Sequence, residues 1–149
     1  MKLLAFDALA LTLVRSAAIV AQAYDADDFK GKFAGIDTTG IHGDHGIEME
    51  GKMKVWFKTV TTTDDGDGGT LEGKFFYEGE HEDDEDTEDI VGVWFEDGSF
   101  HLIESEQTGT IKGSLHGKGK NLYASLVLTE PGSGGGDGLV AAAHRLDKK

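Results

Sequence analysis

Cysteine is absent from this chain of 149 residues. Disulfide bonds, thiolate metal ligands and thiol nucleophiles are therefore excluded. A small domain without disulfides must be stabilised by its hydrophobic core and its backbone hydrogen bonds. This condition favours a closed sheet, in which no edge strand is left unpaired.

Basic residues are scarce, with 14 Lys and Arg against 28 Asp and Glu and a net charge of −14. Nucleic acid is excluded as a partner, because its binding depends on clustered Lys and Arg that neutralise phosphates. Anionic membrane surfaces are disfavoured for the same reason. Cations and basic partners are compatible with this charge.

Long apolar runs are also missing, since no uninterrupted stretch reaches the roughly 20 residues that a membrane-spanning helix needs. Membrane insertion is therefore not expected. Residues 1–23 instead form a mostly apolar segment ending in Ala21-Gln22-Ala23, which predicts a signal peptide cleaved near Ala23. Asp7 and Arg15 interrupt this segment, and the alternative is an amphipathic helix on an intracellular protein. Export predicts a secreted, periplasmic or extracellular location, with residues 24–149 as a single domain.

Familiar catalytic motifs are missing as well. The chain has no Gly-x-Ser-x-Gly, no His-Glu-x-x-His and no phosphate-binding Gly-Lys-Ser/Thr loop. An enzyme is therefore the last of the functional hypotheses. An isomerase or cyclase that uses a barrel lumen with one inward acid is the enzyme alternative, and His144 or Arg145, whichever points inward, is its most suspect residue.

Strict alternation from Ile47 to Lys58 is the clearest pattern that is present. Met49, Met53, Val55 and Phe57 share one phase, and the other phase is dominated by charged residues. Because side chains of a strand point to opposite faces in turn, this pattern predicts a strand with one buried face.

Similar runs recur along the chain and predict eight strands in all. Turn sequences rich in Asp and Gly separate most of them, and no helical period follows residue 23. Glycines lie inside four strands, which favours a sheet curved until it closes. The sequence thus predicts an all-β, antiparallel up-and-down barrel, with a β-sandwich as the alternative. The expected strands are 31–36, 47–59, 70–78, 89–95, 99–104, 109–115, 121–128 and 139–146.

The short first strand, Gly31 to Gly35, the eight sequential strands and the export signal together resemble the calycin-type barrels, which include lipocalins and avidins. The resemblance spans roughly residues 29–147 and differs at Phe33, where lipocalins place Trp in a Gly-x-Trp motif. It implies a pocket for a small ligand inside the barrel.

An up-and-down topology places alternate connections at the same end of the barrel. The connections 37–46, 79–88, 105–108 and 129–136 share one end, and they carry three of the six histidines and a run of acidic residues. This convergence predicts a divalent-cation site, with the alternative of solvated polar loops. Its candidate ligands are His42, Asp44, His45 and His81.

The inward phase predicts the residues that would meet a ligand in the lumen. An eight-stranded barrel can be filled by its own side chains or can hold one small ligand, and both alternatives stay open. The candidate lumen residues are Met49, Met53, Phe57, Phe75 and Tyr77.

Aromatic residues in the outward phase predict an exposed patch of Trp56, Phe76 and either Trp94 or Val93. The alternative is that neighbouring lysines cover these rings. Three hypotheses follow: a module that binds a small apolar or amphipathic ligand in its lumen, an interaction protein or homo-oligomer that uses Trp56, Phe76 and Trp94, and a cation-binding protein. None of them requires a cofactor beyond a divalent cation.

Overall fold

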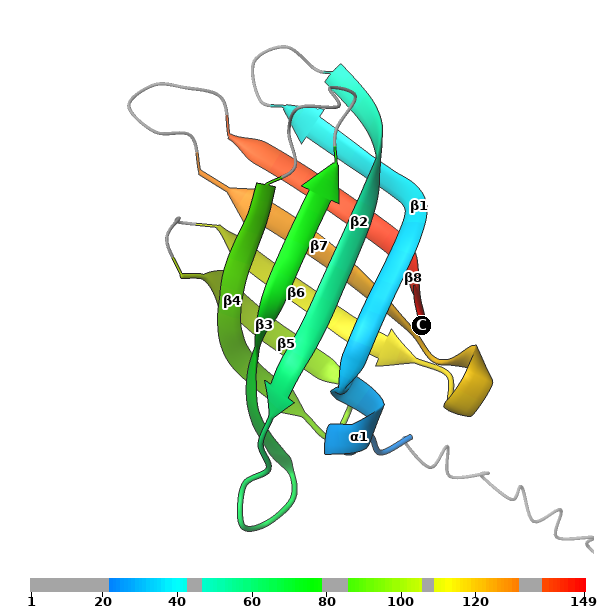
Figure 1. The fold of residues 1–149 in the computed structure, drawn as a ribbon, viewed down its shortest axis with the longest axis vertical. Helices are drawn as coiled ribbons and strands as arrows, with labels where there is room; N and C mark the ends of the chain where they lie inside the picture. Colours follow the sequence, from blue (N-terminus) through cyan, green and yellow to red (C-terminus); the bar gives the residue numbers. More distant parts are fainter. Residues whose placement is uncertain (1–21, 43–46, 79–85, 106–108, 132–137) are drawn as a thin grey trace, which may run out of the picture.

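The computed structural model describes residues 22–42, 47–78, 86–105, 109–131 and 138–149 (Figure 1), with backbone alone for residues 36–42, 47–50, 78, 86 and 139. Two short helices accompany the strands: α1 (Ala26–Phe29) and the 3-10 helix η1 (Gly119–Asn121). The strands are β1 (Gly31–His42), β2 (Ile47–Val60), β3 (Gly68–Glu78), β4 (Asp86–Phe95), β5 (Ser99–Glu104), β6 (Thr110–His116), β7 (Tyr123–Glu130) and β8 (Leu139–Lys148).

The eight strands form a closed barrel in sequence order, with β1 paired to β8. All neighbouring pairs are antiparallel, as the barrel in Figure 1 shows. The prediction of an up-and-down barrel is confirmed, and the sandwich alternative is excluded. In the part of the chain that the structure describes, no helix is long and apolar enough to span a bilayer.

The alternation predicted for β2 is present in the burial of its side chains. Met53, Val55 and Phe57 are buried, whereas Lys54 and Trp56 between them are exposed. Glycine supports the curvature at one point of the neighbouring strand, where Gly73 lies opposite Phe57 beside a register shift. A Cβ atom at Gly73 would come within 1.9 Å of the Trp56 carbonyl oxygen, so only glycine fits there.

The helix α1 closes one end of the barrel, which we call the plug end. Phe29 of α1 is fully buried, and its ring lies 5.0 Å from the Trp94 ring and 6.2 Å from the Phe100 ring, centroid to centroid. Phe57 joins this cluster, with its centroid 5.5 Å from that of Phe100. The lumen at the plug end is therefore filled by aromatic side chains. No helix was predicted here, because four residues are too few to display a helical period.

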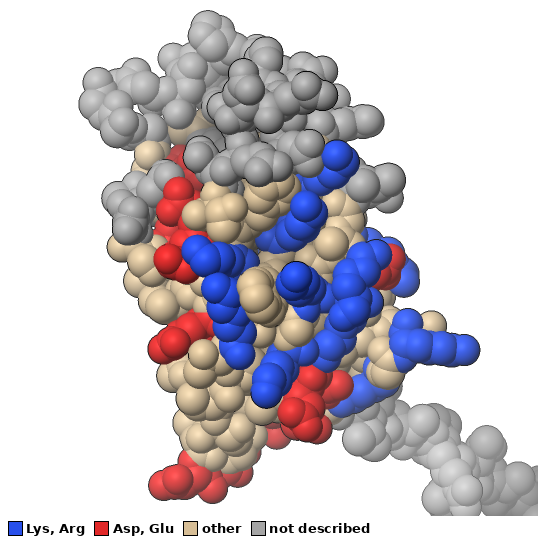
Figure 2. Space-filling model, in the orientation of Figure 1, with Lys and Arg blue, Asp and Glu red and all other residues tan. Residues whose placement is uncertain are grey.

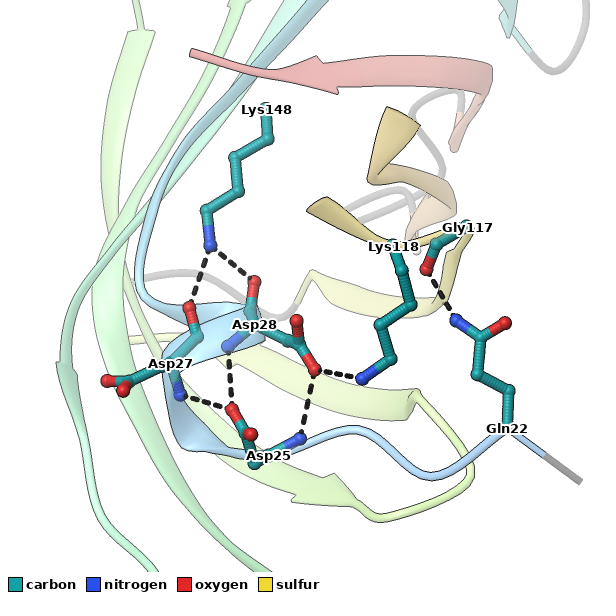
Figure 3. A network of polar contacts seen from close by, with 7 residues as sticks. All are labelled: Gln22, Asp25, Asp27, Asp28, Gly117, Lys118 and Lys148. Carbon is teal, nitrogen blue, oxygen red and sulfur yellow. Dashed lines mark hydrogen bonds and ion pairs between the residues drawn. The ribbon is translucent and has the colours of Figure 1, made fainter. Parts of the chain in front are cut away.

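Hydrogen bonds fix α1 in place (Figure 3). Asp25 caps the helix, since its side chain accepts hydrogen bonds from the backbone amides of Asp27 and Asp28. The Nζ of Lys148 donates to the carbonyl oxygens of Asp27 and Asp28 over 2.7 and 2.8 Å. Lys118 forms an ion pair with Asp28 at 2.5 Å. The polar groups of the plug end are thus extensively paired.

Trp94 corrects one prediction, because it is buried rather than part of an outer patch. It is 1% exposed, and its indole Nε1 donates to the carbonyl oxygen of Thr61 at 2.8 Å. Strand β4 has apolar residues in both phases, so alternation could not decide which phase faces inward. The outward phase instead holds Val91, Val93 and Phe95.

Candidate binding site at the barrel mouth

The end of the barrel opposite α1, which we call the mouth, carries a buried acidic side chain. Glu104 ends β5 in the same phase as the buried Phe100 and Leu102, and it is only 3% exposed. Within the described part of the chain, neither of its carboxylate oxygens has a hydrogen-bond partner. Because buried charge without a partner is strongly destabilising, this group is unusual for a structural position.

Burial raises the pKa of the Glu104 carboxyl from 4.5 to about 7. Repulsion from the carboxylates of Glu130 and Glu88 adds to this shift. The backbone N–H of Gly109 lies close enough to the carboxylate to lower the pKa in part, but it does not reach hydrogen-bond geometry with either oxygen. At neutral pH the carboxyl group is therefore present in both its protonated and its ionised form. It can donate a hydrogen bond when protonated and can pair with a cation when ionised.

The local backbone explains how the carboxyl fits. The amide of Glu104 donates to the carbonyl oxygen of Gly109 at 3.1 Å, across the connection from β5 to β6. A Cβ atom at residue 109 would lie 2.0 Å from Oε2 of Glu104, so the missing side chain of Gly109 makes room for the carboxyl group.

Glu88 and Glu130 place further negative charge around this position. Glu88 shares the inward phase of β4 with Ile90, which lies opposite Glu104 in the ladder. Glu130 ends β7 in the phase of the buried Leu126 and Leu128. Both carboxylates are half-buried. Their charges act on the Glu104 carboxyl and favour a cation beside it.

Tyr77 supplies a second buried polar atom at this end. It lies near the end of β3, and its hydroxyl is buried with no hydrogen-bond partner among the described residues. Burial raises the pKa of Tyr77. A phenol that keeps its proton can donate one hydrogen bond and accept another. The mouth thus offers two unpaired polar groups, whereas the plug end is filled and paired.

The candidate lumen residues fall into two groups. Met53, Phe57 and Phe75 are buried, and Tyr77 packs against the same core. Phe57 belongs to the aromatic cluster of the plug end, which leaves the other three as candidates near the mouth. Met49 lies in β2, but its side chain is outside the described residues.

The candidate metal ligands are largely outside the described residues. Asp44, His45 and His81 lie there, and His42 ends β1 with only its backbone described. Among the side chains that the structure describes, no group of three or more His, Asp or Glu residues is arranged to hold a metal ion.

The outer aromatic residues adopt the predicted arrangement except at Trp94. Lys54 lies opposite Phe76 and Trp56 opposite Lys74, which makes the two aromatic residues diagonal neighbours. Trp56 is 40% exposed, whereas Phe76 is half-buried. Lysine ammonium groups lie over both rings.

The residues proposed for a lumen enzyme do not point inward. His144 and Arg145 are both exposed, and Arg145 contacts the Tyr123 ring and bonds to Asp147. Sequence reasoning missed Glu104, although its phase relative to Phe100 and Leu102 would have identified it as an inward acid.

Comparison with protein-family models, with curated proteins and with solved structures finds no significant match to this chain.

Proposed function

We propose that this protein is an exported binding module that holds a small amphipathic amine at the mouth of its barrel. The observation that carries the proposal is the Glu104 carboxyl, which is buried and has no hydrogen-bond partner among the residues that the structure describes. A ligand ammonium group would pair with it through a charge-assisted hydrogen bond and remove the cost of its burial. The resemblance to calycin-type barrels, which bind ligands at the same kind of site, agrees with this function.

The charge around Glu104 selects the sign of the ligand. Glu88 and Glu130 already disfavour ionisation of Glu104, and a bound cation would lower the energy of all three carboxylates. An anionic ligand would meet repulsion there instead. The Tyr77 hydroxyl offers a further hydrogen bond to a polar group of the ligand.

The filled plug end limits the size of the ligand. Phe29, Phe57 and Trp94 occupy the lower lumen, so the apolar part of a ligand would contact the walls above them, near Met53 and Phe75. A short, flat or narrow apolar group fits this description better than a long acyl chain.

A pair of fluorescent probes tests the proposal. Dansylcadaverine carries an apolar dansyl group and a terminal amine, and N-pentyl dansylamide has the same chain without the amine. We expect the cationic probe to bind the full chain at pH 8 and the Glu104→Gln variant to bind it at least about tenfold more weakly. The neutral probe should not distinguish the two proteins.

A control substitution and a pH series test whether Glu104 itself binds the amine. Glu96→Gln removes an exposed acid at the plug end and should leave cationic binding unchanged. Binding of the cationic probe should also weaken as pH falls through about 7, where Glu104 takes up its proton. Equal binding of the two probes, or equal effects of the two substitutions, would refute a role for Glu104.

A further inference from the structure

A groove on the outer face of β1, β2 and β3 forms a second candidate site, separate from the mouth. Its volume is about 340 Å³, which lies within the range of small-molecule sites. Figure 2 shows Lys and Arg side chains gathered over this face of the molecule. The side chains that define the groove are Lys32, Lys54, Trp56, Lys74, Phe76 and Lys149.

Three lysines at this face contact aromatic rings rather than acids. The Nζ of Lys54 lies 4.3 Å from the centroid of the Phe76 ring. The Nζ atoms of Lys32 and Lys58 lie 4.6 and 4.7 Å from that of Trp56. Among the described residues, no carboxylate forms an ion pair with these three lysines, whereas Lys74 beside them pairs with Asp89 at 3.0 Å.

This arrangement is unexpected in a chain with 28 acidic and 14 basic residues. Ion pairs with surplus carboxylates would be the ordinary environment of a lysine here, yet the basic side chains are close to one another. Neighbouring like charges repel, and a bound anion would relieve that repulsion. The rings restrain the ammonium groups and leave part of their N–H donors available to a ligand.

Trp56 adds an apolar contact to this positive site. Its side chain is 40% exposed, and strand pairing places it between Lys32 on β1 and Lys74 on β3. A ligand that combines a negative group with a flat ring can therefore meet lysine donors and the indole together.

We propose that this groove binds a small organic anion that carries a carboxylate, sulfonate or phosphate group on a flat ring. The proposal does not depend on the amine site at the mouth, because the two sites lie on different surfaces and select opposite charges.

The probe for this site is 8-anilinonaphthalene-1-sulfonate, with N-phenyl-1-naphthylamine as its uncharged counterpart. We expect the sulfonate to bind the full chain with a rise in fluorescence and with energy transfer from Trp56. The double substitution Lys32→Gln and Lys54→Gln should weaken its affinity about tenfold, because two charge-assisted contacts are lost. Binding of the uncharged probe should not change.

Lys112 provides the matched control. It lines two other outer grooves, of about 410 and 340 Å³, which the described residues form around β5 and β6. Lys112→Gln should leave the affinity for the sulfonate unchanged, and Trp56→Phe should reduce the energy transfer, since Trp56 lines the groove itself.

Two results would overturn the proposal. One is an unchanged sulfonate affinity in the Lys32 and Lys54 double variant, with its fold verified by circular dichroism. The other is an equal loss in Lys112→Gln, which would assign the binding to the grooves around β5 and β6. Neither result would affect the amine site, since Glu104 is intact in all of these variants.

Discussion

The two ends of this barrel differ in how their polar groups are paired. At the plug end, Asp25 caps α1 and Lys148 donates to two of the helix's backbone carbonyls. At the mouth, the Glu104 carboxyl and the Tyr77 hydroxyl are buried and have no hydrogen-bond partner in the described ranges of the chain. Paired groups are explained by stability alone, whereas unpaired buried groups cost stability and therefore point to a ligand. This contrast supports the proposed ligand site at the mouth.

The largest expected effect on stability comes from removing the Phe29 ring of α1 from the plug end. Phe29→Ala removes a fully buried ring that contacts Phe57, Trp94 and Phe100. We expect the free energy of unfolding to fall by about 3–5 kcal/mol, as measured by chemical denaturation. Phe95→Ala, at an outer position that is 43% exposed, is the control and should cost far less. Similar losses for both variants would contradict the assignment of Phe29 to the core.

The next largest effect is expected at Glu104 in the mouth, where a substitution should raise the free energy of unfolding and not lower it. Glu104 has a pKa of about 7 in the folded chain against 4.5 as its ordinary value. Between these values the unfolded chain loses the proton first, so the free energy of unfolding falls as pH rises from about 4.5 to 7. Glu104→Gln should remove this dependence and stabilise the protein at pH 8 by up to about 3 kcal/mol.

Denaturation series at pH 5 and pH 8 measure this difference. Glu96→Gln, at an exposed position, should follow the wild type at both values. A Glu104→Gln variant that is less stable than the wild type at pH 8 would mean that the carboxylate has a stabilising partner, and the contrast between the two ends would then be wrong.

The outline of the barrel could be predicted from the sequence because alternation is a local property of each strand. Residues 47–59 and 99–104 match β2 (Ile47–Val60) and β5 (Ser99–Glu104) closely. The helix that closes the plug end could not be predicted in the same way. Helix α1 has four residues, and its role depends on contacts of Phe29 with strands far away in the sequence.

The candidate site was harder to predict than the fold because burial of a single polar residue depends on the closed barrel. Glu104 is one of 28 acidic residues, and only its phase with Phe100 and Leu102 distinguishes it from the solvated ones. Trp94 was misplaced for a related reason. Strand β4 is apolar on both faces, with Val91 and Val93 outside. Its sequence pattern therefore could not show which phase faces the core.

A smaller effect is expected from the cap of α1. Asp25→Ala removes the side chain that accepts hydrogen bonds from the amides of Asp27 and Asp28. Loss of such a cap typically costs about 1 kcal/mol, and thermal or chemical denaturation would measure it. Asp64→Ala, at an exposed position between β2 and β3, should have little effect. A loss of stability in Asp25→Ala as large as that in Phe29→Ala would indicate that the Phe29 ring is buried only when the helix is capped.

The smallest change in stability, but the most specific one, is expected from Gly109→Ala. The new Cβ would lie 2.0 Å from Oε2 of Glu104, so the flexible carboxyl end must move. If it moves toward water, the pKa of Glu104 falls toward its ordinary value, and the decline in stability between pH 5 and 8 becomes shallower. We expect a net change of about 0.5 kcal/mol or less at pH 5, together with weaker binding of dansylcadaverine. An unaltered pH dependence would show that Gly109 does not position the carboxyl group. The contrast between the two ends would then be explained without Gly109, by the unpaired groups of Glu104 and Tyr77 themselves.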